Sequence, residues 1–234
     1  MTIVTSAITL ISAAFDHDLS AQSDQSGQPA NALGHVAGSE AKWASSGLPR
    51  RLRSIRSWLT FWPNETIADQ FLAQRIDHIP LLKDATDVVV GLLHPFATHG
   101  DVNWIGGQPN PLNLDLAPRP EKAAPVFVIT SAGIGTAGLG AVAFGQGTYK
   151  VRKTIREQNT LRFETQILPD SPLTDGPTLS LWDNLKAVMS FAYQNDPHKS
   201  AMAAMNHDDI LRGSFTRCAV KSFSGVWQGR RIDI

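Results

Sequence analysis

The sequence lacks several features that define common protein classes. It has 234 residues but one cysteine, Cys218, so an intramolecular disulfide is excluded and a cysteine-based zinc cluster is not supported. Lys and Arg number 21 and Asp and Glu number 21, which gives a formal net charge of zero. This balance gives no support for a general nucleic-acid surface or a polybasic membrane surface. The single thiol suits a reducing compartment, so a cytoplasmic location is expected.

Long apolar runs are also missing. No run of eighteen apolar residues occurs, and the closest stretch, residues 130–149, is interrupted by glycine and glutamine. Residues 1–15 are apolar but lack the basic start of a signal peptide, so they indicate a strand. We therefore expect no membrane span and at most peripheral contact with a membrane surface. Four arginines between residues 50 and 56 indicate the solvated start of a strand, and no nucleic-acid partner is expected.

A stretch late in the chain repeats an earlier one. Residues 179–198, LSLWDNLKAVMSFAYQNDPH, align without a gap on residues 59–78, LTFWPNETIADQFLAQRIDH. Each identical pair has the same separation of 120 residues (182 − 62). The identical pairs are Leu59 and Leu179, Trp62 and Trp182, Asn64 and Asn184, Phe71 and Phe191, Gln74 and Gln194, and His78 and His198. Two copies of one supersecondary unit are therefore expected.

Apolar periodicity predicts the same order of elements in both halves. In the first half we expect strands at 5–13, 41–48, 54–62 and 87–96, and a helix that begins at 63–65. Residues 16–40 are polar and glycine-rich, with a weak helical signal. In the second half we expect strands at 126–130, 161–167, 178–182 and 214–223, a helix that ends near 157, one over 185–192 and a short one from 198. Each half thus follows a β-α-β-β-α-β order, the ferredoxin-like pattern.

This order predicts an α+β fold made of tandem ferredoxin-like repeats. The first repeat spans residues 1–108, a proline-rich linker spans 109–124, and the second repeat spans 125–234. A single sheet of this kind exposes one face, and two such sheets bury those faces by closing into a barrel with the helices outside. We therefore expect a pseudo-symmetric barrel of the dimeric α+β type within one chain. Its interior, or a cleft between sheet and helices, would hold an apolar ligand.

His198 is the main candidate for chemistry. It lies in the first turn of the helix that Asp196 and Pro197 initiate, where the helix dipole favours neutral imidazole. Neutral imidazole is the form that ligates a metal or haem iron. The other interpretation is a histidine that packs between helix and sheet and bonds to a backbone carbonyl, and the residues alone favour it. Trp182 and Phe191 would add apolar walls, together with Tyr193, Met202 and Met205.

A glycine run offers a different hypothesis. Residues 133–138, GIGTAG, match the G-x-G-x-x-G pattern directly after an expected strand, and Glu164 ends the next strand. This is the outline of a dinucleotide-binding fingerprint, so a dinucleotide-dependent oxidoreductase is one alternative. Further glycines at 140, 145 and 147 are costly in the helix that should follow. A parallel nucleotide-binding sheet would also break the 120-residue repeat.

Several motifs of the second half resemble one known family. They are residues 128–134 (VITSAGI), 179–182 (LSLW), 191–193 (FAY) with His198 five residues on, 215–217 (FTR) and 225–229 (GVWQG). Over about 110 C-terminal residues the chain resembles the spheroidene monooxygenase family, the carotenoid ketolases of phototrophic bacteria. The first half matches only at its first strand and at the strand that ends in Trp62.

The resemblance implies a haem-dependent, O2-using monooxygenase that introduces a keto group into an acyclic carotenoid such as spheroidene. It implies His198 as the axial ligand of the haem iron, and Trp182, Phe191 and Tyr193 near the cofactor. The charge of Arg217 suggests a role opposite a haem propionate. The partner is then an apolar small molecule, and the sequence does not identify the electron donor. An alternative of another class is a cofactor-free α+β barrel that binds a small apolar ligand without turnover.

Overall fold

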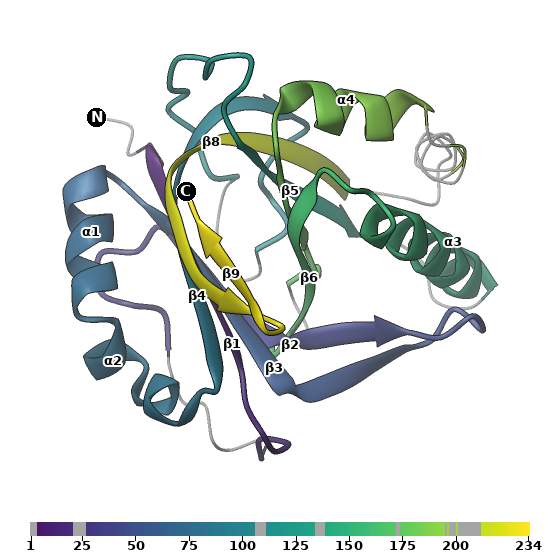
Figure 1. Cartoon of the computed structure of the whole chain (residues 1–234), viewed down its shortest axis with the longest axis horizontal. Helices are drawn as coiled ribbons and strands as arrows, with labels where there is room; N and C mark the ends of the chain where they lie inside the picture. The colour runs from purple at the N-terminus through teal and green to yellow at the C-terminus, as the bar shows by residue number, and fades with distance from the viewer. Residues whose placement is uncertain are drawn as a thin grey trace.

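The protein folds as an antiparallel barrel with helices outside it (Figure 1). The computed structural model describes residues 4–20, 27–105, 111–133, 139–171, 174–194, 196, 200 and 212–234. The strands are β1 (Ala7–Ala14), β2 (Gly34–Trp43), β3 (Pro49–Trp62), β4 (Asp87–His99), β5 (Val126–Gly133), β6 (Leu161–Pro169), β7 (Thr178–Trp182), β8 (Arg212–Trp227) and β9 (Arg230–Asp233).

The strand order closes the barrel. The sheet runs β4-β1-β3-β2-β6-β7-β5-β8-β9, and β4 also pairs with β8. Eight strands therefore form a closed antiparallel ring, and β9 adds a hairpin to the end of β8. Side by side in the sheet, the strands of the first half are arranged β4-β1-β3-β2 and those of the second half β8-β5-β7-β6. The halves meet at two seams, β4 with β8 and β2 with β6.

Helices cover two opposite sides of the barrel. The helices of the first half are α1 (Glu65–Ala73), α2 (Arg75–His78) and the 3-10 helix η1 (Pro80–Asp84), and those of the second are α3 (Leu139–Arg156) and α4 (Leu185–Gln194). In Figure 1, α1 and α2 lie on one side of the barrel, and α3 and α4 lie on the other. No helix in the described part of the chain has the length and apolar character needed to cross a membrane.

The repeated residues build the same local structure twice. Asn64 caps α1 by accepting a hydrogen bond from the amide of Ile67 at 3.0 Å, and Asn184 caps α4 in the same way through Ala187 at 3.0 Å. Each cap satisfies an amide that the first turn of a helix leaves without a partner. The repeat therefore marks, in each half, the point where a buried strand ends and a covering helix begins.

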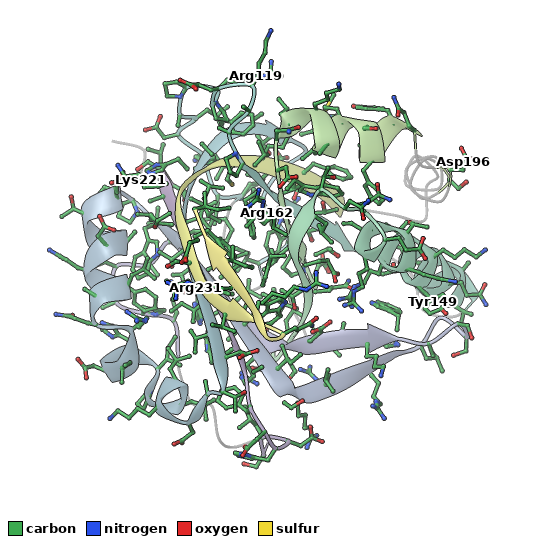
Figure 2. All side chains as sticks on the ribbon, in the orientation of Figure 1. Arg119, Tyr149, Arg162, Asp196, Lys221 and Arg231 are labelled. Carbon is green, nitrogen blue, oxygen red and sulfur yellow. The ribbon has the colours of Figure 1, made fainter. Side chains whose placement is uncertain are left out.

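Aromatic side chains fill the barrel interior. Phe127, Phe163 and Phe223 contact one another with ring centroids 5.3–6.4 Å apart. At one end Trp104, from the connection between β4 and β5, donates to Ser214 Oγ at 2.9 Å. Toward the other end of β8, Trp227 packs on Phe163 at 5.0 Å. The interior is a packed core, and Figure 2 shows the density of side chains there.

Strand alternation places a second apolar layer outside the barrel on each side. The first-half layer lies beneath α1, α2 and η1 and includes Trp58, Trp62 and Phe71. The second-half layer includes Val126, Val128, Trp182, Leu185, Val188 and Phe191, with Ile155 of α3. Successive strand residues point to opposite faces, so one strand supplies both the core and an outer layer. The outer layers are the places where helices meet the sheet.

Some expectations from the sequence differ from the structure. The strand expected at 41–48 is wrong, because β2 spans 34–43 and residues 44–48 form the turn into β3. No helix occurs in residues 16–20 and 27–40, the described parts of the polar segment whose helical signal is weak, and residues 34–40 belong to β2. Gly47 adopts φ +84° in the turn, a conformation that glycine adopts readily and other residues rarely adopt. The polar residues of β2 hide the apolar alternation typical of a strand, so the sequence did not predict that β2 and β3 form a hairpin.

Residues 100–125 connect the two halves, and part of this segment is bound to the barrel. Leu112 pairs with Val102, and the amide of Thr5 donates to the carbonyl of Asn113 at 2.7 Å. Leu112 and Leu114 pack against the interior core. The division of the chain into two repeats and a linker remains a prediction.

Candidate functional site

Arg217 lies on the outer face of the second half. It is on β8, opposite Val128 of β5 and Ala97 of β4 in the strand register. Directly paired residues of antiparallel strands point to the same face, so Arg217 shares the face of the outer apolar layer. Val128 is 7% exposed and belongs to that layer. The strand register therefore places the cation of Arg217 at the edge of the buried apolar layer.

The guanidinium of Arg217 reaches toward α4. Its Nη1 lies 3.8 Å from Sδ of Met189, and within the described part of the chain no carboxylate lies within 4 Å of it. A cation at the edge of an apolar surface loses part of its hydration, and an anion there would compensate for that loss. Arg217 is therefore suited to bind the acidic group of a ligand whose remaining part is apolar.

Trp182 and Phe191 are part of the packed layer between β7 and α4. Trp182 is 2% exposed, and its Nε1 donates to Ser180 Oγ at 2.9 Å. The rings of Trp182 and Phe191 lie 5.3 Å apart. The structure thus brings together two of the residues expected near a cofactor and gives both a packing role. Their role toward a cofactor stays a prediction.

Two large side chains of α4 face solvent. Met189 is 37% exposed and Tyr193 is 58% exposed. They are four residues apart on a helix and therefore lie on the same face. Met189 contacts Arg217, so this exposed apolar face begins where the guanidinium of Arg217 lies. Tyr193 is thus placed on the outer surface of α4 rather than in the packed layer.

His198 lies outside the described residues, as does the short helix expected to begin there. Its counterpart in the repeat, His78, ends α2 and is exposed. The ring of His78 stacks on Phe71 with centroids 5.2 Å apart, so it extends the packing of Trp62 on Phe71. The first copy of the repeated histidine therefore has a packing role at the helix surface.

His99 shares the outer face with Arg217, which the sequence interpretation missed. It ends β4 opposite Phe215, and two residues away Ala97 is opposite Arg217. The sequence predicted a strand ending at residue 96, but β4 extends to His99. Residues two apart on a strand point to the same face, so His99 shares the face of Ala97, and Ala97 is paired with Arg217. Only the register between β4 and β8 reveals this relationship. His94, in contrast, is engaged with Glu65 at 2.9 Å.

The dinucleotide hypothesis is wrong for this fold. β5, which ends at Gly133, is antiparallel to both of its neighbours, β7 and β8. The fingerprint needs a parallel β-α-β unit with the pyrophosphate at the helix N-terminus. Glu164, the expected ribose ligand, instead lies beneath α3, with Oε1 2.6 Å from Arg152 Nε. Residues 134–138 lie outside the described part of the chain.

Glu164 belongs to a buried ion cluster beneath α3. We call Glu40, Arg152, Arg156 and Glu164 the Glu40 cluster. Arg152 lies 2.9 Å from Glu40 Oε1, and Arg156 lies 2.8 Å from the same oxygen and 2.7 Å from Glu164 Oε2. Desolvation alone would lower the pKa of Arg156, but attraction to Glu164 and Glu40 raises it overall. Two carboxylates and two guanidinium groups thus balance their charges.

The described residues satisfy part of what haem would need. Arg217 supplies a cation for a propionate, and α4 presents the exposed side chains of Met189 and Tyr193 beside it, whereas the second-half layer itself is buried against α3 and α4. Arg217 fits the acidic edge of the cofactor, and the two exposed side chains fit its apolar plane. The axial ligand implied by the resemblance, His198, lies outside the described residues, and the fit therefore rests on the apolar surface and Arg217.

Comparisons with known proteins bear on the fold. No protein-family model matches the chain, and a search of curated proteins finds no match. A crystal structure of the aldoxime dehydratase OxdRE in complex with butyraldoxime superposes with a TM-score of 0.51 and 7% identity, covering 93% of this chain and 80% of that one. At that identity the likeness shows the fold alone. The chain is thus an α+β antiparallel barrel of the dimeric α+β barrel type.

Two weaker likenesses accompany it. A candidate monooxygenase from Lactobacillus acidophilus NCFM has a TM-score of 0.41 at 11% identity, covering 98% of this chain and 99% of that one. An anthrone oxidase-like protein has a TM-score of 0.34 at 10% identity, covering 97% and 95%. Both scores are too low to support a shared function.

Proposed function

We propose that the protein is an O2-dependent monooxygenase that binds haem on the outer face of the second half of the barrel. The proposed reaction introduces a keto group into an acyclic carotenoid such as spheroidene. The observation that carries the proposal is Arg217, a cation without a described carboxylate partner, beside an apolar layer in the half that resembles the ketolase family. Bound haem would supply the redox chemistry that activates O2.

The residues of this chain have distinct roles in the proposed site. Arg217 binds an acidic edge of the cofactor and fixes its orientation through a charge-assisted hydrogen bond. Met189 and Tyr193, which α4 presents beside Arg217, would form an apolar wall against one face of the cofactor. His198 would bind the iron, as the motif resemblance implies. Trp182 and Phe191 hold α4 on β7 and so position that wall.

The packed interior supports this location. Aromatic rings occupy the barrel, and Trp104 and Trp227 lie toward opposite ends of it. A long apolar substrate would need a space in the interior that the packed rings now occupy, whereas the outer layer ends in the exposed side chains Met189 and Tyr193. We place the protein in the cytoplasm. Because carotenoids dissolve in lipid, it would contact a membrane surface peripherally to reach its substrate. It would also depend on a separate electron donor.

We also infer that the barrel consists of two tandem ferredoxin-like repeats. The strand order 4-1-3-2 within each half supports this, as do the matching Asn64 and Asn184 caps. The second half has both helices of the pattern. In the first half no helix occurs in the described residues between β1 and β2, so that repeat would have lost its first helix.

Turnover tests the proposal directly. Purified protein supplied with haem, spheroidene, reductant and O2 should form a keto product that carries 18O when 18O2 is used. Arg217→Gln should weaken haem binding and lower product formation together. The matched control is Arg162→Gln, which removes an exposed arginine paired with Asp183. Turnover without haem, or product without 18O, would contradict the proposal.

A second candidate is a cofactor-free barrel that binds an apolar ligand without turnover. The observation in its favour is that Trp182 and Phe191 repeat the packing of Trp62 and Phe71, so these aromatic residues need no cofactor to explain them. Stoichiometric carotenoid binding, with no keto product under the same conditions, would favour this candidate.

A further inference from the structure

The two seams of the barrel are built differently. The β4–β8 seam is a long ladder that runs from Val89 opposite Gly225 to His99 opposite Phe215. The β2–β6 seam has three residue pairs, from Gly38 opposite Pro169 to Glu40 opposite Ile167. Backbone ladders are the main cohesive element between strands, so the short seam has less backbone support.

Charged side chains hold the short seam from outside. At the β2 end of the Glu40 cluster, Arg152 and Arg156 of the second half bond to Glu40 of the first, and Arg152 also donates to the carbonyl of Ala41. On the same seam Arg51 of β3 donates to the carbonyl of Leu168 at 2.8 Å.

Asp170, the residue directly after β6, receives two more contacts from arginines of β3. Arg51 lies 3.2 Å from Asp170, and Arg56 also pairs with Asp170. The seam thus explains part of the arginine cluster of this strand, because two of the four arginines between residues 50 and 56 bind Asp170, directly after β6. They are bridges between the halves rather than a solvated surface.

The Glu40 cluster is unevenly bonded. Both oxygens of Glu164 are used, with Oε1 2.6 Å from Arg152 and Oε2 2.7 Å from Arg156. Glu40 bonds to the arginines through Oε1, and its buried Oε2 has no hydrogen-bond partner among the described residues. A buried carboxylate oxygen without a partner gains hydrogen bonds to water when it is exposed. If the cluster is opened, we therefore expect the contacts between Glu40 and the two arginines to break, while Arg152 and Arg156 remain bound to Glu164.

We propose that the barrel opens reversibly along the β2–β6 seam and that Glu40 is the lock that keeps it closed. Opening separates β2 from β6, hydrates Glu40 and leaves the β4–β8 ladder intact as the hinge. Because α3 carries Arg152 and Arg156, it moves with the second half. The seam would then be the route by which solvent or a small molecule reaches the packed interior. This proposal does not depend on the proposed enzymatic function.

Amide hydrogen exchange of the full-length protein, followed by mass spectrometry, tests the seam without any substitution. Amides of residues 38–40 and of Leu168 should exchange at least tenfold faster than those of 89–93 and 222–225 under conditions where the whole protein stays folded. Equal protection at the two seams would overturn the proposal, because it would mean that both open only with global unfolding.

A substitution then tests the lock. Glu40→Gln keeps the side-chain volume but removes the charge, and it should speed exchange of residues 34–43 and 161–169 at least a further tenfold, with no change at 87–99. The control is Lys42→Gln, an exposed residue on the same strand, which should leave both seams unchanged. A uniform increase across both seams would assign Glu40 a general structural role and overturn the lock. If Glu40→Gln does not fold, the wild-type comparison still decides.

Discussion

The ring of Trp182 at the end of β7 packs on Phe191 of α4 with centroids 5.3 Å apart, and Trp62 packs on Phe71 of α1 at 4.9 Å. The paired residues are 120 positions apart in the sequence (182 − 62), and each pair joins a strand to the helix that follows it. Each tryptophan also donates its Nε1 to a buried hydroxyl, Ser180 Oγ for Trp182 and Thr9 Oγ1 for Trp62. The repeated residues therefore have the same packing role in both halves of the barrel.

This relationship predicts similar costs for two substitutions. Phe71→Ala and Phe191→Ala each remove a buried ring and should lower the free energy of unfolding by about 3–5 kcal/mol. Chemical denaturation followed by tryptophan fluorescence measures both. A cost near zero for Phe191→Ala would mean that the ring is not packed as in the structure and would return Phe191 to a purely cofactor-facing role.

The helix caps give a second pair. Asn64→Ala and Asn184→Ala each remove the side-chain oxygen that accepts a first-turn amide, and each should cost about 1 kcal/mol of unfolding free energy. Asn64→Asp and Asn184→Asp keep an acceptor at the cap and should retain most of the stability. Loss of stability in the Asp variants equal to that in the Ala variants would contradict the capping role.

Two glycines of α3 should respond in opposite ways. A Cβ on Gly145 would overlap the carbonyl oxygen of Gly47 in the β2–β3 turn, whereas a Cβ on Gly147 meets nothing within 4 Å. Gly145→Ala should therefore destabilise the protein by about 1–3 kcal/mol through overpacking. Gly147→Ala should stabilise it by about 0.8–1 kcal/mol, because alanine favours the helix.

Thermal melts of the two variants measure this difference. Glycine at position 145 has a low helix propensity, but it allows the β2–β3 turn to pack closely on α3. If both substitutions shift the melting temperature in the same direction, the contact between Gly47 and Gly145 is not as described.

The buried thiol gives a prediction about pH. Cys218 is fully buried, and desolvation raises its pKa well above that of a free thiol. Because the unfolded state loses the thiol proton at a lower pH than the folded state, stability should fall as pH rises above about 8.5, the value for an exposed cysteine. Cys218→Ala should remove this part of the alkaline loss.

Alkylation provides the measurement. At pH 8, Cys218 in the native protein should react with iodoacetamide only as fast as the protein opens, and full reaction should need denaturant. Rapid labelling of the native protein would show that the thiol is accessible and would contradict its burial in the barrel core.

The sequence could predict the local elements of the fold better than its long-range contacts. The repeat located Trp62, Asn64 and Phe71 in one half from their counterparts in the other, because strand end, cap and helix face all lie within a few residues. Most of the strands and the long helices were predicted near their observed positions. The start of β2 was not, because its polar and glycine residues hide the alternation.

The ion cluster shows why the rest could not be predicted. Arg162, Glu164 and Gln166 alternate with apolar residues along β6, a pattern typical of a strand with one polar side facing solvent, yet Glu164 and Gln166 are buried. Glu164 is paired with Arg152, whose other carboxylate partner, Glu40, is 112 residues before it, and Gln166 accepts a hydrogen bond from Trp43. A single sequence does not indicate which distant charges meet. The same holds for Arg217 and His99, whose shared face depends on the register of β4 and β8.

The most direct test of the central proposal is a haem titration monitored by visible absorption, using wild type, His198→Ala and His78→Ala. The account predicts that the wild-type protein and His78→Ala develop the same sharp Soret band at one haem per chain, and that His198→Ala does not. His78 is the matched control because it is the repeat counterpart and stacks on Phe71. A wild-type protein that binds no haem, or a His198→Ala spectrum identical to wild type, would contradict the account.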